Sequence, residues 1–306
     1  MARQIGGLQA RIEYAGIAAG IAALRSMSRE GAFRFGELLG AMAMKIDRPN
    51  RPIALKNLEI AFPEKSHDER LKIIRGMYRN FGRMLGEWSH MGRLDRSNIE
   101  QFAAYEGKQH WVEAENMSRG RGGIILSAHF GNFELLPVAH SIYGYRVAVV
   151  HRPLRNPFID KVVRETRTRS GNQMITRKGG AMEMMRLLRQ NWHLGVLLDL
   201  DVRRGVFVDF FGKLASTSDG IARMARATGA PVVPCFIVRE GDTMHHKIQI
   251  QPPVEIVRTT DAEADNHENT QRCTKAIEKA IREHPDHWNW IHRRWKTRPP
   301  GEARFY

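Results

Sequence analysis

The sequence GGIILSAHFGNFELL, residues Gly122–Leu136, is the stretch that decides the fold. Its apolar run at 124–126 follows two glycines and predicts a short buried strand, and the residues from Phe133 onward predict the start of a helix. Polar side chains lie between the two elements: His129 falls on the predicted turn, and Glu134 lies about one helical turn further on. A strand that leads directly into a helix is typical of α/β proteins.

The same alternation continues along the chain on the C-terminal side of this stretch. Strands that alternate with helices predict an α/β fold with a largely parallel sheet covered by helices on both faces. The strands are expected at 123–127, 145–150, 173–176, 194–199, 231–238 and 246–252, and the helices at 132–141, 156–170, 179–191, 217–228 and 266–283.

Residues 1–100 have a different pattern and predict a helical N-terminal region, membrane-associating or lid-like, before an α/β core at 101–306. We expect both regions to form one structural domain. The most apolar N-terminal run, residues 14–24, has eleven uncharged residues. A membrane span needs about 20. This run therefore predicts a helix that lies on a membrane or packs on the domain.

Polar residues just beyond predicted strand ends suggest a site, because ligands bind beyond the carboxyl ends of parallel strands. An imidazole at such a rim can act as a base, and the carboxylate of Glu134 would orient the ring. Gly131 would let backbone approach a substrate, and free N–H groups at the helix start would stabilise developing negative charge. On spacing alone, a hydrogen-bonded loop histidine is equally compatible with the sequence. The residues at predicted strand ends are His129, Arg152, Arg177 and Asp199.

The charge balance favours an anionic partner. The 306 residues include 48 Lys and Arg against 33 Asp and Glu, a net charge of +15. Four kinds of anionic partner are compatible with this charge: nucleic acid, an anionic membrane face, a phosphorylated lipid and an acidic carrier protein. The arginines are dispersed and no nucleic-acid-binding motif occurs, so we expect no nucleic-acid partner.

Cysteine and histidine usage argues against a disulfide scaffold and against a metal site. Cys235 and Cys273 are the only cysteines. His284, His287 and His292 lack cysteine or carboxylate partners at ligand-like spacing, and we therefore expect no metal.

Several motifs together resemble one protein family. The segment from His129 to Glu134 is an H-x4-E motif, and the chain from about residue 50 to 299 resembles the bacterial late acyltransferases of lipid A biosynthesis, the lauroyl/myristoyl type. These are part of the glycerolipid and lysophospholipid acyltransferase superfamily, most of which has H-x4-D. The other motifs, in the family's order, are AFPEKS (61–66), HRPLRNPFID (151–160), ITRKGGAM (175–182), LLDLD (197–201), GVFVDFFGKLAST (205–217), GAPVVPCF (229–236) and HWNWIHRRWKTRP (287–299).

This resemblance implies an O-acyltransferase without a cofactor beyond its acyl thioester co-substrate. The donor would be acyl carrier protein or coenzyme A, with the carrier protein favoured, and the acceptor a lipid A precursor or related glycolipid. His129 would act as general base without a covalent intermediate, since Ser127 lacks the G-x-S-x-G setting of a nucleophile. We expect a peripheral or weakly anchored enzyme at the cytoplasmic face of the inner membrane. The alternative is a lysophospholipid or other membrane-lipid acyltransferase that uses acyl-coenzyme A.

The resemblance also suggests supporting roles for residues outside the H-x4-E motif. Asp199 lies in the family's D-Q-D-type segment, although Leu200 replaces the frequent glutamine, and it would either support His129 or cap the following turn. Guanidinium groups match phosphate oxygens in pairs, but each arginine can equally be an ordinary surface residue. The residues assigned to substrate binding are Gly131, Asn132, Arg152, Arg167 and Arg177.

Two aromatic groups have alternative interpretations. Phe207, Phe210 and Phe211 would form a wall of an acyl channel or belong to the ordinary core. Trp288, Trp290 and Trp295 would anchor the protein at a membrane interface or pack back on the domain as a structural clamp, which we favour.

Overall fold

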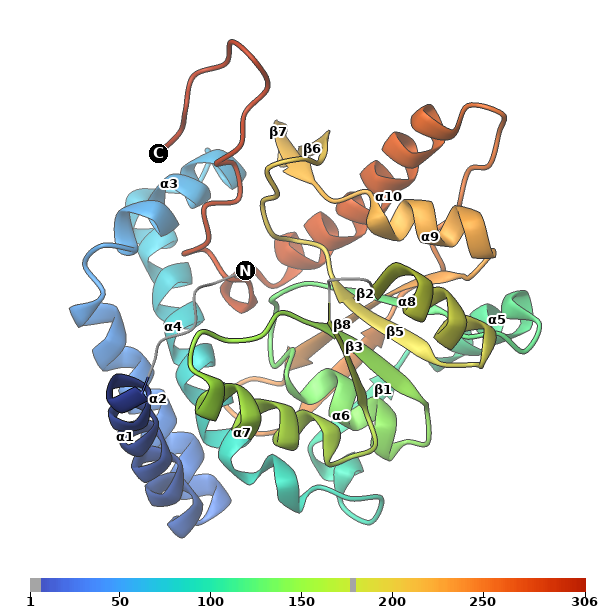
Figure 1. Ribbon diagram of the computed structural model, residues 1–306. Coiled ribbons are helices and arrows are strands. Elements are labelled where there is room, and N and C mark those ends of the chain that lie inside the picture. Colours follow the sequence, from blue (N-terminus) through green and yellow to red (C-terminus); the bar gives the residue numbers. More distant parts are fainter. Residues whose placement is uncertain (1–6, 177–179) are drawn as a thin grey trace.

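The predicted α/β fold with a largely parallel sheet is confirmed by a computed structural model that describes residues 7–176 and 180–306 (Figure 1). Within these residues, a seven-stranded sheet has the order β1-β9-β8-β2-β5-β3-β4, and β6 and β7 form a separate hairpin. All neighbours in the large sheet pair in parallel except β8 and β9. The strands are β1 (Ala103–Glu106), β2 (Ile124–Ser127), β3 (Val147–His151), β4 (Gln173–Thr176), β5 (His193–Leu197), β6 (Val206–Phe210), β7 (Lys213–Thr217), β8 (Val232–Arg239) and β9 (His246–Ile250).

The helical N-terminal region is also as predicted, and its helices lie together along one side of the sheet (Figure 1). Among the described residues, no helix is both long and apolar enough to cross a membrane. The α-helices are α1 (Gly7–Ser26), α2 (Arg29–Ile46), α3 (Arg51–Ala61), α4 (His67–His90), α5 (Lys108–Ser118), α6 (Leu135–Ile142), α7 (Pro157–Thr168), α8 (Gly180–Arg189), α9 (Gly220–Thr228) and α10 (Ala262–Glu283), and the 3-10 helices are η1 (Met91–Arg93), η2 (Ile99–Gln101) and η3 (Pro285–His287).

Both faces of the sheet are buried, which explains why its strands are almost continuously apolar. Successive side chains of a strand point to opposite faces. In β2, Ile124 and Leu126 therefore join a core made with α8, α9, α10 and the N-terminal helices α3 and α4. Ile125 points the other way and joins a core with α5 and α6. The shared first core connects the N-terminal helices to the sheet.

The C-terminal tryptophans form a structural clamp. The side chains of Trp288, Trp290 and Trp295 have 0% exposure, so they cannot anchor the protein at a membrane interface. Their rings pack against β6 and the residue after it: Phe210 lies 5.7 Å from Trp288 and 5.6 Å from Trp295 between ring centroids, and Phe211 is buried beside Trp290. The hairpin is thereby fixed to the C-terminal segment.

Helices α2 and α4 approach each other closely at glycine residues. Substitution of a glycine at this contact is therefore expected to lower stability. A Cβ atom on Gly82 would lie 2.1 Å from the carbonyl oxygen of Gly36, whereas a Cβ on Gly20 of α1 would meet nothing within 4 Å. We expect Gly82→Ala to lower the free energy of unfolding by about 1–3 kcal/mol, because the helices must separate. Gly20→Ala should raise it by up to about 1 kcal/mol through helix propensity. Urea unfolding of both variants measures the difference, and equal stability would contradict the close packing.

Candidate active site

The strand order brings three predicted site residues to one edge of the sheet. His129 follows β2, Asp199 follows β5 and Arg152 follows β3, and these strands are direct neighbours in the order β2-β5-β3. Because the strands are parallel, their carboxyl ends lie at the same edge. Arg177 lies outside the described residues.

His129 is paired with Asp199 rather than with the acid of its own motif. The ring Nδ1 of His129 lies 2.9 Å from Oδ1 of Asp199, and the backbone N–H of His129 donates to Oδ2 over 2.9 Å. The carboxylate accepts a hydrogen, so Nδ1 carries the proton of the neutral ring and Nε2 keeps its lone pair. Asp199 is 2% exposed, and the indole N–H of Trp288 also donates to its Oδ2 over 2.9 Å. The carboxylate is thus held by three donors.

The two groups shift each other's pKa in opposite directions. Burial alone would raise the pKa of Asp199, but the charge of His129 and the hydrogen bonds from His129 and Trp288 outweigh it and lower the pKa to about 2. Burial alone would lower the pKa of His129, but the negative charge and hydrogen bond of Asp199 raise it above its ordinary value. Asp199 therefore stays ionised at neutral pH and makes His129 a stronger base.

Glu134 does not hydrogen-bond the ring of His129 as predicted, although its charge contributes to the raised pKa of that ring. Glu134 is the residue before the first turn of α6, and its side chain forms a two-point ion pair with Arg167 of α7, with Nε to Oε2 at 2.8 Å. Nη1 of Arg167 also donates to Nδ1 of His151 over 3.2 Å, and Nε2 of His151 donates to Asp160 over 2.8 Å. Arg167 thus already has two protein partners, and its predicted role as a free phosphate ligand does not fit this geometry.

Gly131 and Asn132 have structural roles in the turn, and the polar groups described below are already bonded within the protein. Gly131 has φ +56°, and a Cβ atom there would lie 1.8 Å from the carbonyl oxygen of Ile237, so only glycine fits beside β8. Its N–H donates to the carbonyl of His287. Asn132 is 1% exposed, donates to Glu87 over 2.8 Å and caps α6 by accepting from the N–H of Leu135. The N–H groups of His129 and Gly131 are therefore occupied and cannot stabilise an oxyanion.

A large, mainly apolar cavity of about 1060 Å³ adjoins the His129–Asp199 pair. Ligand pockets usually have about 300–1,000 Å³, so this one fits a substrate with long chains. His129, Ser127 and Arg152 line it together with apolar residues of α1, α4, α7, α8 and α9. Phe207, Phe210 and Phe211 do not line it, which favours the second of the two interpretations, that they belong to the ordinary core.

Two further polar residues at the cavity differ in their surroundings. Ser127 is buried, and its Oγ has no hydrogen-bond partner within the described chain, so it has no base that would make it a nucleophile. Arg152 is exposed, lines the cavity and forms no ion pair with any residue that the structure describes. Arg167 also lines the cavity but is paired with Glu134, so Arg152 is the one of the described assigned arginines that has no acidic partner among the described residues.

The C-terminal histidines are engaged in hydrogen bonds that support the fold. Nε2 of His287 accepts from the N–H of Arg239, and Nε2 of His292 accepts from the N–H of Asp201 over 2.9 Å. No group of three or more His, Cys, Asp or Glu side chains that could hold a metal ion occurs at residues 7–176 or 180–306.

Trp288 is expected to position Asp199, because its indole N–H is one of the three donors to that carboxylate. Hydrogen bonds to charged groups contribute about 1.5–3 kcal/mol, so Trp288→Phe should lower kcat about tenfold or more with little change in KM. Trp295→Phe is the matched control: Trp295 is equally buried and packs on the same Phe210, but its indole N–H has no hydrogen-bond partner within the described residues. Steady-state kinetics of both variants test this, and equal losses would show that Trp288 acts only through packing.

A histidine with a buried carboxylate partner, at a sheet edge beside a large apolar cavity, has the geometry of an enzyme active site for a largely apolar substrate. Residues 4–297 match the sequence model of the bacterial lipid A biosynthesis acyltransferases, and the chain belongs to this family of acyltransferases.

Curated relatives cover most of the chain. The lipid A biosynthesis palmitoleoyltransferase of Escherichia coli (strain K12) is 30% identical over 274 residues, 89% of this chain and 87% of that protein. The lauroyltransferase of the same strain is 29% identical over 272 residues, 88% of this chain and 86% of that protein. The myristoyltransferase is 28% identical over 271 residues, 88% of this chain and 82% of that protein. The relatives thus differ from one another in the acyl chain that their names give.

Proposed function

We propose that this acyltransferase transfers a fatty acyl chain from an acyl thioester to a hydroxyl group of a lipid A precursor or a related glycolipid, with His129 as general base. The observation that carries this proposal is the hydrogen bond between His129 and Asp199 beside a cavity of about 1060 Å³. The names of the relatives support the acceptor, since each is a lipid A biosynthesis enzyme.

In the proposed reaction, Nε2 of His129 removes the proton of the acceptor hydroxyl while the oxygen attacks the thioester carbonyl. The new C–O bond forms and the C–S bond breaks, and the thiolate that leaves takes the proton back from the imidazolium. Asp199 stabilises the imidazolium and keeps the ring in the required tautomer. The proposed transfer is direct, because the Oγ of Ser127 is hydrogen-bonded to no base among the described residues.

Arg152 is the arginine that we assign to an anionic group of the substrate. It lies one residue beyond β3, lines the cavity and has no acidic partner among the described residues. A guanidinium group binds phosphate oxygens in pairs. Leu200 also lines the cavity and is 38% exposed.

We also propose that the enzyme works at the cytoplasmic face of the inner membrane through peripheral contacts. Helix α1 exposes large apolar side chains, with Leu8 at 74% and Ile12 at 65% exposure. Arg11 lies between them, and the chain has a net charge of +15. Apolar and basic side chains on one helix favour the interface of an anionic membrane.

The test of the function is an assay with purified protein, acyl carrier protein loaded with a fatty acyl chain, and lipid acceptors. Mass spectrometry should find a lipid A precursor whose mass has increased by one acyl group. Lysophosphatidic acid, offered in parallel, should remain unmodified. If lysophosphatidic acid alone is acylated, the chain is a membrane-lipid acyltransferase with a different acceptor, and the proposed acceptor is wrong.

The donor proposal makes a prediction about salt. An acyl carrier protein is acidic, and Arg203 and Arg204 are exposed beside Val202, which lines the cavity. Attraction between opposite charges accelerates association and weakens with ionic strength. We therefore expect kcat/KM with acyl carrier protein to fall steeply as salt rises, while kcat changes little. Arg203→Glu should reduce this reaction more than the one with acyl-coenzyme A. Equal salt slopes for both donors would remove the case for carrier-protein docking.

A further inference from the structure

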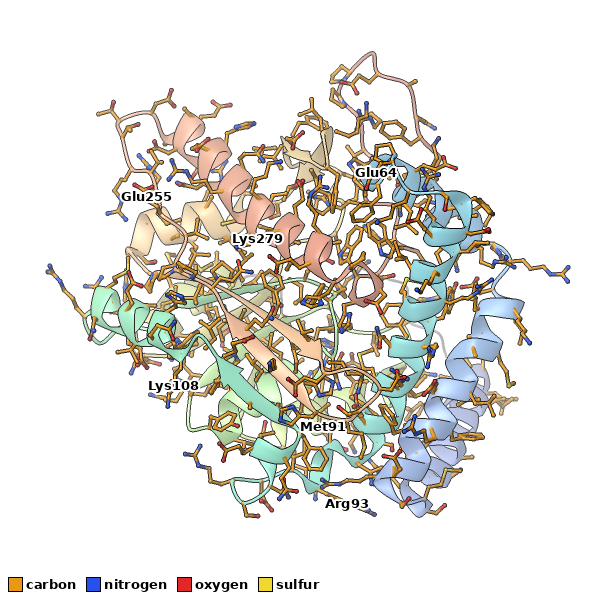
Figure 2. The ribbon with its side chains drawn as sticks, turned by 180° about the vertical axis from the view of Figure 1, so that it is seen from behind. Glu64, Met91, Arg93, Lys108, Glu255 and Lys279 are labelled. Atoms are coloured by element: carbon orange, nitrogen blue, oxygen red, sulfur yellow. The ribbon has the colours of Figure 1, made fainter. Side chains whose placement is uncertain are left out.

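Four arginines gather where α1, α4 and α7 end and α2 begins. Arg25 lies in the last turn of α1 and Arg29 is the first residue of α2. Arg93 closes η1, which directly follows α4, and Arg169 is the residue after α7. None of the four forms an ion pair with an acidic side chain in the described part of the chain. Figure 2 labels Arg93 at the edge of the molecule, next to the ends of the N-terminal helices.

The guanidinium groups are held by backbone carbonyl oxygens of their neighbours. Arg29 donates to the carbonyl of Arg93 over 2.9 Å, and Arg93 donates to the carbonyl of Arg25 over 3.3 Å. Arg25 in turn donates to the carbonyl of Ser89 over 3.2 Å. Arg169 completes the group, since a Cβ atom on Gly92 would lie 2.9 Å from its Nη1. The four side chains, here named the arginine cluster, are thus fixed close together.

This arrangement concentrates positive charge, which the carboxylate of Asp95 offsets in part at Arg29. Burial lowers the pKa of His90, and the charges of Arg93, Arg29 and Arg25 lower it further. Cations at helix C-termini complement the helix dipole, which accounts for Arg25 and Arg169. Arg29, however, lies in the first turn of α2, where the dipole disfavours a cation. A bound anion would reduce the repulsion among these charges.

The cluster lies beside one end of the apolar cavity. Three cavity-lining residues, Ile21, Trp88 and Val163, precede cluster arginines by one to two helical turns on α1, α4 and α7. The cavity reaches the surface near these helices, because its lining residues Ile17 and Leu85 are 43% and 42% exposed. An opening with apolar walls and a cationic end fits an amphiphile whose headgroup is anionic.

We propose that the arginine cluster binds a phosphate group of the lipid acceptor while the acceptor's apolar part enters the opening at α1 and α4. The inference rests on the proposed function, because it needs a phosphorylated lipid as acceptor. Arginine forks bind phosphate through pairs of charge-assisted hydrogen bonds, and several forks together fix its position. The cluster would thereby choose the phosphorylated lipid and orient its hydroxyl toward His129.

The test compares the double variant Arg29→Gln/Arg93→Gln with the control Arg119→Gln/Arg121→Gln. The control removes the same charge from exposed arginines in the segment between α5 and β2, and Arg121 is likewise bonded to a backbone carbonyl, that of Thr228. With a phosphorylated glycolipid acceptor, the cluster variant should have a KM about tenfold or more above the wild type and a nearly unchanged kcat. With the same glycolipid after phosphatase treatment, wild type and cluster variant should have similar kinetics. The control should resemble the wild type with both acceptors.

Two results would overturn the proposal. One is an equal loss of kcat/KM in the cluster variant with both acceptors. The other is an increase in KM for the acyl carrier protein instead of the lipid, which would make the cluster a carrier-docking surface. A second measurement does not depend on the reaction. Sedimentation with phosphatidylcholine vesicles that contain phosphatidic acid should detect about tenfold weaker binding of the cluster variant than of the control. Equal binding of the two variants would also contradict the proposal. If the wild type acylates neither glycolipid, the proposed function fails, while the vesicle measurement still decides whether the cluster binds a lipid phosphate.

Discussion

His129→Ala is expected to give a folded protein whose kcat is about 10²- to 10⁴-fold below that of the wild type, because general-base assistance contributes about this factor. KM should change much less, since the ring contributes one polar group to a large, mainly apolar cavity. The loss should be in the chemical step, which single-turnover measurements of acyl transfer isolate.

His110→Ala serves as the control for the loss of a histidine. His110 lies in α5, where its ring contacts Glu113 at 3.7 Å, and it does not line the cavity. Thermal melts should be similar for both variants, and only His129→Ala should lose activity. A His129→Ala enzyme that keeps more than about a tenth of the wild-type rate would exclude His129 as the general base.

Asp199→Asn is expected to lower kcat about 10³- to 10⁴-fold, a loss similar to that of His129→Ala. A loss of this size is typical when an amide replaces the carboxylate that orients a catalytic histidine. Both oxygens of Asp199 accept hydrogens, from the ring and the backbone N–H of His129 and from Trp288. An amide has only one oxygen, so one of these donors would face an NH₂ group. The amide also cannot balance the charge of the imidazolium in this buried place.

Glu134→Gln distinguishes support of His129 by Asp199 from support by Glu134, which the H-x4-E motif suggests. Glu134 faces Arg167, so the amide would weaken that ion pair but leave the bond between His129 and Asp199 in place. We expect a smaller loss than for Asp199→Asn. Should Glu134→Gln cost more in kcat than Asp199→Asn, Glu134 and not Asp199 supports the base.

Local patterns predicted the fold well where elements are long or strongly apolar. The strands at 124–127 and 232–239 are apolar runs bounded by glycine or proline, and the structure has them within one or two residues of the predicted positions. The elements that the pattern missed are short or polar: β1 has four residues, α5 has a single large buried residue, Trp111, and the β6–β7 hairpin lies outside the alternation. These elements form through contacts with distant parts of the chain.

The site was predicted less completely, for a reason of geometry. Spacing along the chain favoured Glu134 as the partner of His129, but α6 begins only at Leu135, and Glu134 faces α7 instead. The actual partner, Asp199, is 70 residues away and reaches the ring because β5 pairs with β2. The support from Trp288 is 89 residues from Asp199 and follows no local pattern. Pairing between strands, which decides these contacts, is not visible in residue spacing.

The most direct test of the account is the pH dependence of kcat/KM for wild type and Asp199→Asn. The base must be neutral, so the rate should rise with pH through the pKa of His129, which in the wild type lies above its ordinary value. Without the charge of Asp199, burial dominates and lowers the pKa of His129, so the midpoint of the residual activity should move to lower pH. The same midpoint in both enzymes, or a wild-type midpoint well below that of an ordinary histidine, would contradict the assignment of His129 and Asp199 as the general base and its support.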